Sequence, residues 1–95
     1  MRISAAQRQS IVRATRMSFG EESSVWLFGS RADDSRRGGD VDLYVETSQS
    51  HPLMVELRCK ISIEESLDLH VDLVVNDHRD NKLIFLIAKN TGVQL

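Results

Sequence analysis

Hydrophobic positions spaced three or four residues apart predict three helices, at about residues 4–18, 50–68 and 77–91. Ser4 and Gln7 have the spacing of a capping box at the start of the first helix. Helical spacing relates Ile3, Ala6, Ser10, Ala14 and Met17 in the first helix, and Leu53, Leu57 and Ile61 line one face of the second. In the third helix, Leu83, Ile84 and Ile87 are predicted to face the core.

Three other segments have the pattern of β-strands. Residues 24–29 form a short apolar run with β-branched and aromatic side chains, which is typical of a strand buried on both faces. Residues 40–46 and 69–75 alternate between apolar and polar positions, which predicts two half-buried strands. The order of elements predicts an α+β fold, or α/β sandwich, in which a small mixed three-stranded sheet carries helices on one face. Residues 93–95 add at most a short stub of strand.

Composition narrows the possible functions. The chain has 95 residues, of which 41% are hydrophobic and 27% charged, so we expect a single domain over residues 1–95. A net charge of −2 lacks the basic excess that neutralises phosphates, so direct nucleic-acid binding is not expected. The only cysteine, Cys59, has no partner for a disulfide. With neither a membrane span nor a secretory signal in the sequence, we expect a cytoplasmic protein.

The candidate catalytic and binding residues lie around the loop between the first two predicted strands. Gly29 ends the first strand, Ser30 and Arg31 follow it, and Asp40 and Asp42 open the second strand. Nine residues separate Ser30 from Asp40. Because side chains alternate along a strand, the two carboxylates share one face, roughly 6.5 Å apart along the backbone, from where both can bind Mg²⁺. A glycine at a strand end lets a triphosphate approach the backbone closely, while Ser30 and Arg31 supply donors for phosphate oxygens.

A third carboxylate, Asp72, lies on the polar face of the last predicted strand. If that strand neighbours the strand of Asp40, then Asp72 completes an acidic triad. The three histidines share no spacing that indicates a metal site, and only His70 lies on the same face as Asp72.

These residues resemble the DNA polymerase β-like nucleotidyltransferase superfamily, and within it the minimal nucleotidyltransferases that serve as antitoxins to HEPN-domain ribonuclease toxins. Gly29, Ser30, Asp40 and Asp42 match the Gly-Ser-x(n)-Asp-x-Asp signature, and Asp72 matches the downstream strand aspartate. The resemblance implies a nucleotidyltransferase fold, ATP as substrate, two Mg²⁺ ions held by the three catalytic aspartates, and a Gly-Ser pair that holds the triphosphate. It also implies transfer of AMP to a hydroxyl of a HEPN toxin.

The chain departs from the usual pattern of this family in one place. Nine residues, rather than ten, separate Ser30 from Asp40, and Gly39 stands where a serine is common. This difference changes the loop that would contact the triphosphate, but the carboxylates still align with those of the family motif.

Two other functions stay open at this stage. The first is an antitoxin that blocks its partner by occlusion, with a vestigial acidic site, although the complete set of motif residues argues against decay. The second is a small-molecule nucleotidyltransferase, whose relatives carry an added helical substrate domain for which 95 residues leave no space. Because no segment remains to enclose an acceptor, we expect a partner protein to dock over the sheet face that carries the aspartates.

Overall fold

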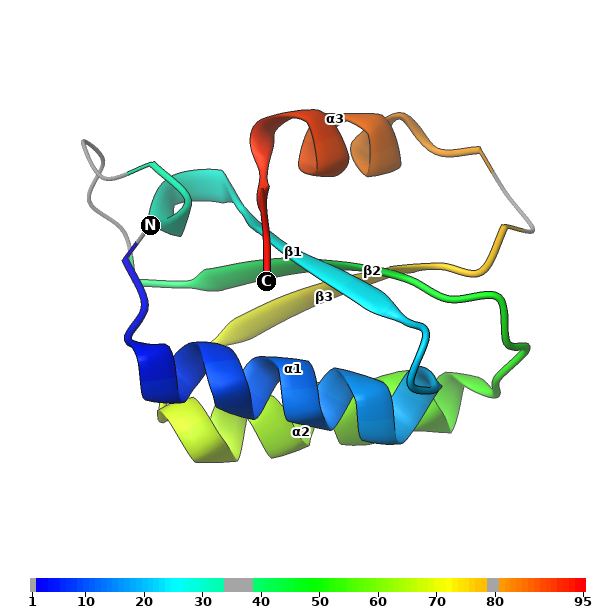
Figure 1. Ribbon diagram of the computed structural model, residues 1–95, viewed down its shortest axis with the longest axis horizontal. Coiled ribbons are helices and arrows are strands. Elements are labelled where there is room, and N and C mark those ends of the chain that lie inside the picture. Colours follow the sequence, from blue (N-terminus) through cyan, green and yellow to red (C-terminus); the bar gives the residue numbers. More distant parts are fainter. Residues whose placement is uncertain (1, 34–38, 79–80) are drawn as a thin grey trace.

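The computed structural model describes residues 2–33, 39–78 and 81–95. In these residues one four-stranded sheet lies between two helices on one face and a third helix on the other (Figure 1). The elements in chain order are α1 (Ala5–Phe19), β1 (Ser24–Phe28), the 3₁₀ helix η1 (Gly29–Arg31), β2 (Val41–Glu46), α2 (Leu53–Leu67), β3 (Val71–Asn76), α3 (Leu83–Thr91) and β4 (Val93–Gln94). None of the helices in the described ranges is long and apolar enough to span a bilayer.

The strand order in the sheet is β3-β2-β1-β4. β1 pairs antiparallel with β2 and with β4, whereas β2 pairs parallel with β3 through the crossover helix α2. The predicted α+β fold is thus confirmed, but the prediction of three strands is wrong. Val93 and Gln94 pair with Leu27 and Trp26 as a fourth strand, which is too short to show an alternating pattern in the sequence.

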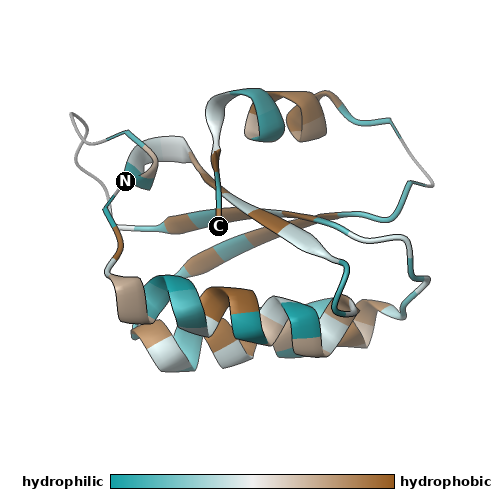
Figure 2. Cartoon of the chain, viewed as in Figure 1, coloured by the Kyte–Doolittle hydropathy of each residue, from teal (hydrophilic) through white to brown (hydrophobic). Residues whose placement is uncertain are grey.

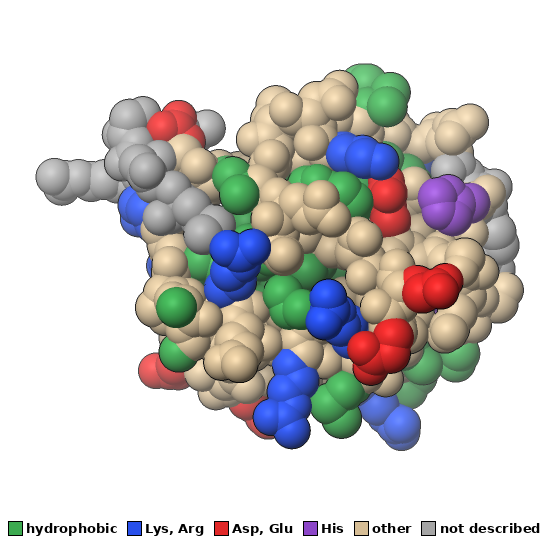
Figure 3. Space-filling model, viewed as in Figure 1, with side chains coloured by type: hydrophobic (Ala, Val, Ile, Leu, Met, Phe, Trp, Pro, Cys, Tyr) green, Lys and Arg blue, Asp and Glu red, His purple; other side chains and the backbone are tan. Residues whose placement is uncertain are grey.

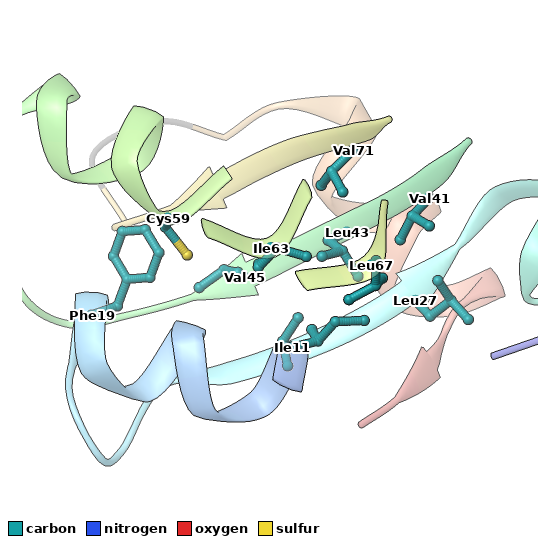
Figure 4. Close-up of a cluster of buried hydrophobic side chains, with 11 residues drawn as sticks. Ile11, Phe19, Leu27, Val41, Leu43, Val45, Cys59, Ile63, Leu67 and Val71 are labelled. Atoms are coloured by element: carbon teal, nitrogen blue, oxygen red, sulfur yellow. The ribbon is translucent and has the colours of Figure 1, made fainter. Parts of the chain in front are cut away.

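The main core lies between the sheet and the pair α1 and α2. Inward-facing strand residues pack there against one stripe of each helix, and Figure 4 shows this cluster. The capping box fixes the start of α1, since the Ser4 hydroxyl accepts from the Gln7 backbone N–H at 3.0 Å and the Gln7 side chain accepts from the Ser4 N–H at 2.8 Å. The buried residues of the cluster are Ile11, Phe19, Val25, Leu27, Val41, Leu43, Val45, Cys59, Ile63, Leu67 and Val71.

The buried faces of α2 and α3 differ from the apolar faces read in the sequence, and of the positions read in the first helix, Ile3 and Ala14 pack against the core whereas Met17 does not. Each helix carries two hydrophobic stripes, and spacing alone does not show which of them meets the sheet. The buried residues are Ile11, Thr15 and Phe19 in α1, Cys59, Ile63 and Leu67 in α2, and Phe85 and Ala88 in α3. By contrast, exposed side chains include Met17 at 78%, Leu53 at 67%, Leu57 at 43%, Ile61 at 52%, Leu83 at 71%, Ile84 at 38% and Ile87 at 45%.

The prediction that the helices share one face of the sheet is also wrong, because α3 covers the opposite face (Figure 1). Its hydrophobic first turns (brown in Figure 2) bring Phe85 onto Tyr44, with ring centroids 5.6 Å apart, and Tyr44 in turn contacts Trp26 at 5.4 Å. Burial raises the pKa of Tyr44 to about 12, so its hydroxyl stays protonated and donates to Glu46 at 2.7 Å. The alternating pattern counted Tyr44 as a polar position, and this second core was therefore not predicted from the sequence.

A matched pair of substitutions in α2 tests which stripe of the helix carries the core. Ile63 is fully buried and Ile61 is half exposed. We expect Ile63→Ala to lower the free energy of unfolding by about 2 to 5 kcal/mol, because it leaves a cavity against the sheet. Ile61→Ala should change it by less than about 1 kcal/mol. Urea denaturation of both variants measures the difference, and equal losses would contradict the buried face described above.

Candidate active site

Parallel pairing of β2 with β3 brings the three predicted aspartates together. The register sets Asp42 directly beside Asp72, and Asp40 lies just before β2. Since Val41 and Leu43 point into the core under α1 and α2, the aspartates lie on the α3 face of the sheet. Ligand atoms of Asp40, Asp72 and His70 all lie within 4.8 Å of one another. The structure therefore satisfies the geometric condition on which the acidic triad depended.

Electrostatics in this cluster are unfavourable without a cation. The pKa of Asp42 is raised above its ordinary value of 3.8, first by burial and then by repulsion from Asp72 and Asp40, with His70 acting weakly in the opposite direction. Carboxylates held side by side on neighbouring strands destabilise a sheet unless a positive charge joins them. A divalent cation supplies that charge, and hard carboxylate oxygens suit Mg²⁺.

Gly29 closes the cluster at the end of β1. Its φ of +72° lies in the left-handed region, and a Cβ at this position would overlap the carboxylate of Asp42. Phe28, the preceding residue, is paired with Asp42 in the β1–β2 register. The absence of a side chain at position 29 therefore leaves room for the carboxylate of Asp42 against the end of β1, and the predicted contact of Gly29 with a triphosphate stays a prediction.

Arg31 lies at the base of the loop that joins β1 to β2. Its guanidinium donates to the Gly39 carbonyl from Nε at 3.2 Å and from Nη2 at 2.9 Å, and to the Arg2 carbonyl from Nη1 at 3.0 Å. Arg31 thus ties the far end of the loop to the N-terminal segment, and its predicted contact with phosphate stays a prediction. Ser30, in the middle of η1, is half buried, and residues 34–38 lie outside the described part of the chain.

His70 and Glu64 extend the cluster beyond the predicted aspartates. His70 faces Asp72 through Nε2 at 3.4 Å and Glu64 through Nδ1 at 3.2 Å, and Glu64 also accepts from the Val71 backbone N–H at 3.0 Å. The sequence already placed His70 two residues before Asp72, and therefore on the same face of the strand. Nothing in the helical pattern of α2 distinguished Glu64 from a solvated carboxylate.

A hollow in the surface of the protein lies away from the aspartates, His70 and Glu64. It measures about 670 Å³ and runs along α1 between Arg8, Arg13 and Arg16 and the C-terminal Leu95. Figure 3 shows Lys and Arg side chains on this face of the molecule. None of the clustered carboxylates lines this hollow.

The family model for "Polymerase beta, Nucleotidyltransferase" matches residues 16–94, which contain the whole carboxylate cluster and the Gly-Ser turn. The chain belongs to the polymerase β nucleotidyltransferase family. In this nucleotidyltransferase family member, Gly29 and Ser30 lie in η1. Asp40 comes just before β2, while Asp42 and Asp72 are paired on β2 and β3. No curated protein gives a significant sequence match to the chain.

Solved structures with the same fold include antitoxins bound to toxins. Two mutants of the toxin–antitoxin complex MntA–HpeT superpose with TM-scores of 0.71 and 0.72, at 21% and 19% identity. The matches cover 93% of this chain and 69% and 70% of those chains. A tri-AMPylated HEPN toxin of Shewanella oneidensis in complex with MNT antitoxin matches with a TM-score of 0.70 at 20% identity, over 93% of this chain and 67% of that one. At these identities the similarity shows a shared nucleotidyltransferase fold.

Repulsion within the cluster predicts a stabilising substitution in this nucleotidyltransferase. Because the pKa of Asp42 is raised, the folded state holds this proton more tightly than the unfolded chain does. Without divalent cations, stability therefore falls as the pH rises through the raised pKa, and the loss persists at pH 7. We expect Asp42→Asn to raise the free energy of unfolding at pH 7 in EDTA by roughly 0.2 to 1 kcal/mol and to flatten this pH dependence.

Thermal unfolding between pH 4 and pH 8 measures the effect. Glu65→Gln, the same change of acid to amide on an exposed position of α2, is the control and should alter stability by less than about 0.5 kcal/mol. If Asp42→Asn instead destabilises the protein at pH 7, the carboxylate is a structural hydrogen-bonding group and the account of repulsion is wrong.

Proposed function

We propose that the protein is a Mg²⁺-dependent nucleotidyltransferase that transfers AMP from ATP to a hydroxyl of a HEPN-type toxin and thereby neutralises it as an antitoxin. One observation carries the proposal. Asp42 and Asp72 stand side by side on parallel strands, with Asp40 next to them, where Gly29 leaves room for the Asp42 carboxylate. This arrangement supports a cation site at one end of the sheet, next to the Gly-Ser turn that we propose holds the triphosphate.

Each residue of the cluster has a role in this proposal. When two Mg²⁺ ions are bound, they polarise the α-phosphate, lower the pKa of the acceptor hydroxyl and offset the charge of the leaving pyrophosphate. Asp40 and Asp42 hold the cations beside the nucleotide, and Asp72 lies on the side from which an acceptor approaches. Gly29 and Ser30 bring the backbone and a hydroxyl close to the triphosphate.

The chemistry that this geometry supports is an in-line displacement. The acceptor oxygen forms a bond to the α-phosphorus, and the bond from that phosphorus to the bridging oxygen of pyrophosphate breaks. The hydroxyl proton passes to a carboxylate or to water, and pyrophosphate leaves. In such a reaction the protein contributes mainly position and electrostatic stabilisation.

The choice of a protein acceptor rests on the comparisons and on the architecture. The similar solved structures are antitoxin complexes with toxins, and one of those toxins carries three AMP groups. In the described residues, the carboxylate cluster lies at one end of the sheet, with Asp40 and Asp72 exposed, and no additional helical layer encloses it. A partner must therefore present the hydroxyl from outside.

Incubation with a HEPN-domain protein encoded beside this chain, with ATP and Mg²⁺, tests the proposal directly. Intact mass spectrometry should show that the partner gains the mass of one or more AMP groups, and EDTA should abolish the gain. Asp72→Asn should lower the rate of transfer by roughly 10²-fold or more while the affinity for MgATP changes little, because a group that serves the acceptor acts mainly in the transition state.

Two outcomes would contradict this proposal. A partner that is inhibited in a tight complex without any change in mass would support neutralisation by occlusion. If the partner neither binds nor gains mass, a protein acceptor is excluded and transfer to a small molecule becomes the better account.

A further inference from the structure

The outer edge of β3 offers hydrogen-bonding groups to another strand. Within the described residues β3 pairs only with β2. The carbonyls of His70 and Asn76 accept from Val41 and Thr47 at 2.9 and 3.0 Å, so the even-numbered residues of β3 bond to β2. Backbone groups alternate in a parallel ladder, and the odd-numbered residues therefore point their N–H and C=O outward.

In the part of the chain that the structure describes, Glu64 occupies the first of these outward positions and no other, where it accepts from the Val71 N–H at 3.0 Å. Leu73 and Val75 follow with the same outward orientation. An edge of this kind is a template for an added strand unless the protein covers or blocks it.

A groove runs along this edge and reaches the active site. It has a volume of about 360 Å³ and is lined by Leu53, Glu56, Leu57 and Lys60 of α2 and by Leu73 of β3. On the other side of β3 it is lined by Asp72 and Val74. The groove thus joins the exposed hydrophobic stripe of α2 to a carboxylate of the catalytic cluster.

We propose that this groove, which we call the β3-edge groove, binds an extended segment of the partner protein as a fifth strand and thereby presents the acceptor hydroxyl to Asp72. The inference rests on the proposed transfer to a partner protein and names how the acceptor is held. Strand addition at a free sheet edge combines backbone hydrogen bonds, which give affinity, with side-chain pockets, which give specificity.

The alternation of side chains specifies the sequence of the acceptor segment. Asp72 and Val74 point to the α3 face, whereas Leu73 and Val75 point to the core side under α2. A residue paired with Asp72 on the added strand lies on the catalytic face, with its Cβ about 5 Å from that of Asp72. Its chain neighbour level with Leu73 then faces Leu57 and Leu73, whereas the neighbour level with Val71 meets the carboxylate of Glu64. The acceptor is therefore a hydroxyl-bearing residue with an apolar neighbour on the Leu73 side.

A pair of charge substitutions separates the groove from the rest of the surface. Leu57→Glu places a carboxylate in the groove, and Met17→Glu places the same charge on α1, where the side chain is 78% exposed and outside the groove. With the adjacent HEPN-domain protein as probe, we expect Leu57→Glu to lower the rate of AMP transfer at limiting partner by about tenfold or more. Met17→Glu should match the wild type, and all three proteins should bind MgATP equally and unfold at similar temperatures.

Hydrogen exchange gives an independent readout on the unmodified protein. The amides of Leu73 and Val75 should exchange quickly in the free protein and become protected when the partner binds. The amide of Val71, already bonded to Glu64, should change less.

The outcomes distinguish this inference from the proposed function. Normal transfer by Leu57→Glu, or unprotected Leu73 and Val75 amides in the complex, would overturn the role of the groove while leaving AMP transfer intact. Equal loss of transfer in both charge variants would overturn it as well. A dimer of the protein alone that Leu57→Glu disrupts would assign the edge to self-pairing. If the wild type leaves the partner unmodified, the proposed function fails and this inference falls with it.

Discussion

Repulsion between carboxylates on adjacent parallel strands is the constraint on which the rest of this structure depends. Asp42 and Asp72 are register partners, and Asp40 stands beside them, so three acidic groups share one small surface. Burial of Asp42, and then repulsion from Asp72 and Asp40, raises the pKa of Asp42. This arrangement lowers the stability of the folded sheet. A bound cation relieves the repulsion, and this relief contributes to the affinity of the site for the cation. The cluster is therefore a site that folding alone does not favour.

The surrounding elements hold this cluster in place from both faces of the sheet. α1 and α2 bury the inward side chains of β2 and β3, while α3 buries Tyr44 and Trp26 on the face that carries the aspartates. Gly29 leaves room where a side chain would overlap the carboxylate of Asp42. A domain of this size has little stability to spare, so two cores and a paired sheet are needed to hold like charges together.

Much of this organisation could be predicted from the sequence, because it follows from local patterns. Alternation over residues 40–46 identified β2, and the spacing of Asp40 and Asp42 predicted that they share a face. The buried helix stripes were not predictable, since Leu57 and Ile63 are equally hydrophobic and only the tertiary contacts decide which one meets the sheet. The position of α3 depended on the burial of Tyr44, which a binary pattern counts as polar. The contact of Glu64 with His70 joins two elements and has no local signature.

The most direct test of the central claim is calorimetric titration of the purified protein with ATP in the presence and absence of Mg²⁺. The account predicts that wild-type protein binds ATP only with Mg²⁺, and that the double variant Asp40→Asn, Asp42→Asn loses at least about tenfold in affinity. The double variant should remain folded, because the substitutions remove repulsion rather than packing. Equal binding of ATP by the wild type and the double variant would contradict the claim that these carboxylates form the cation site.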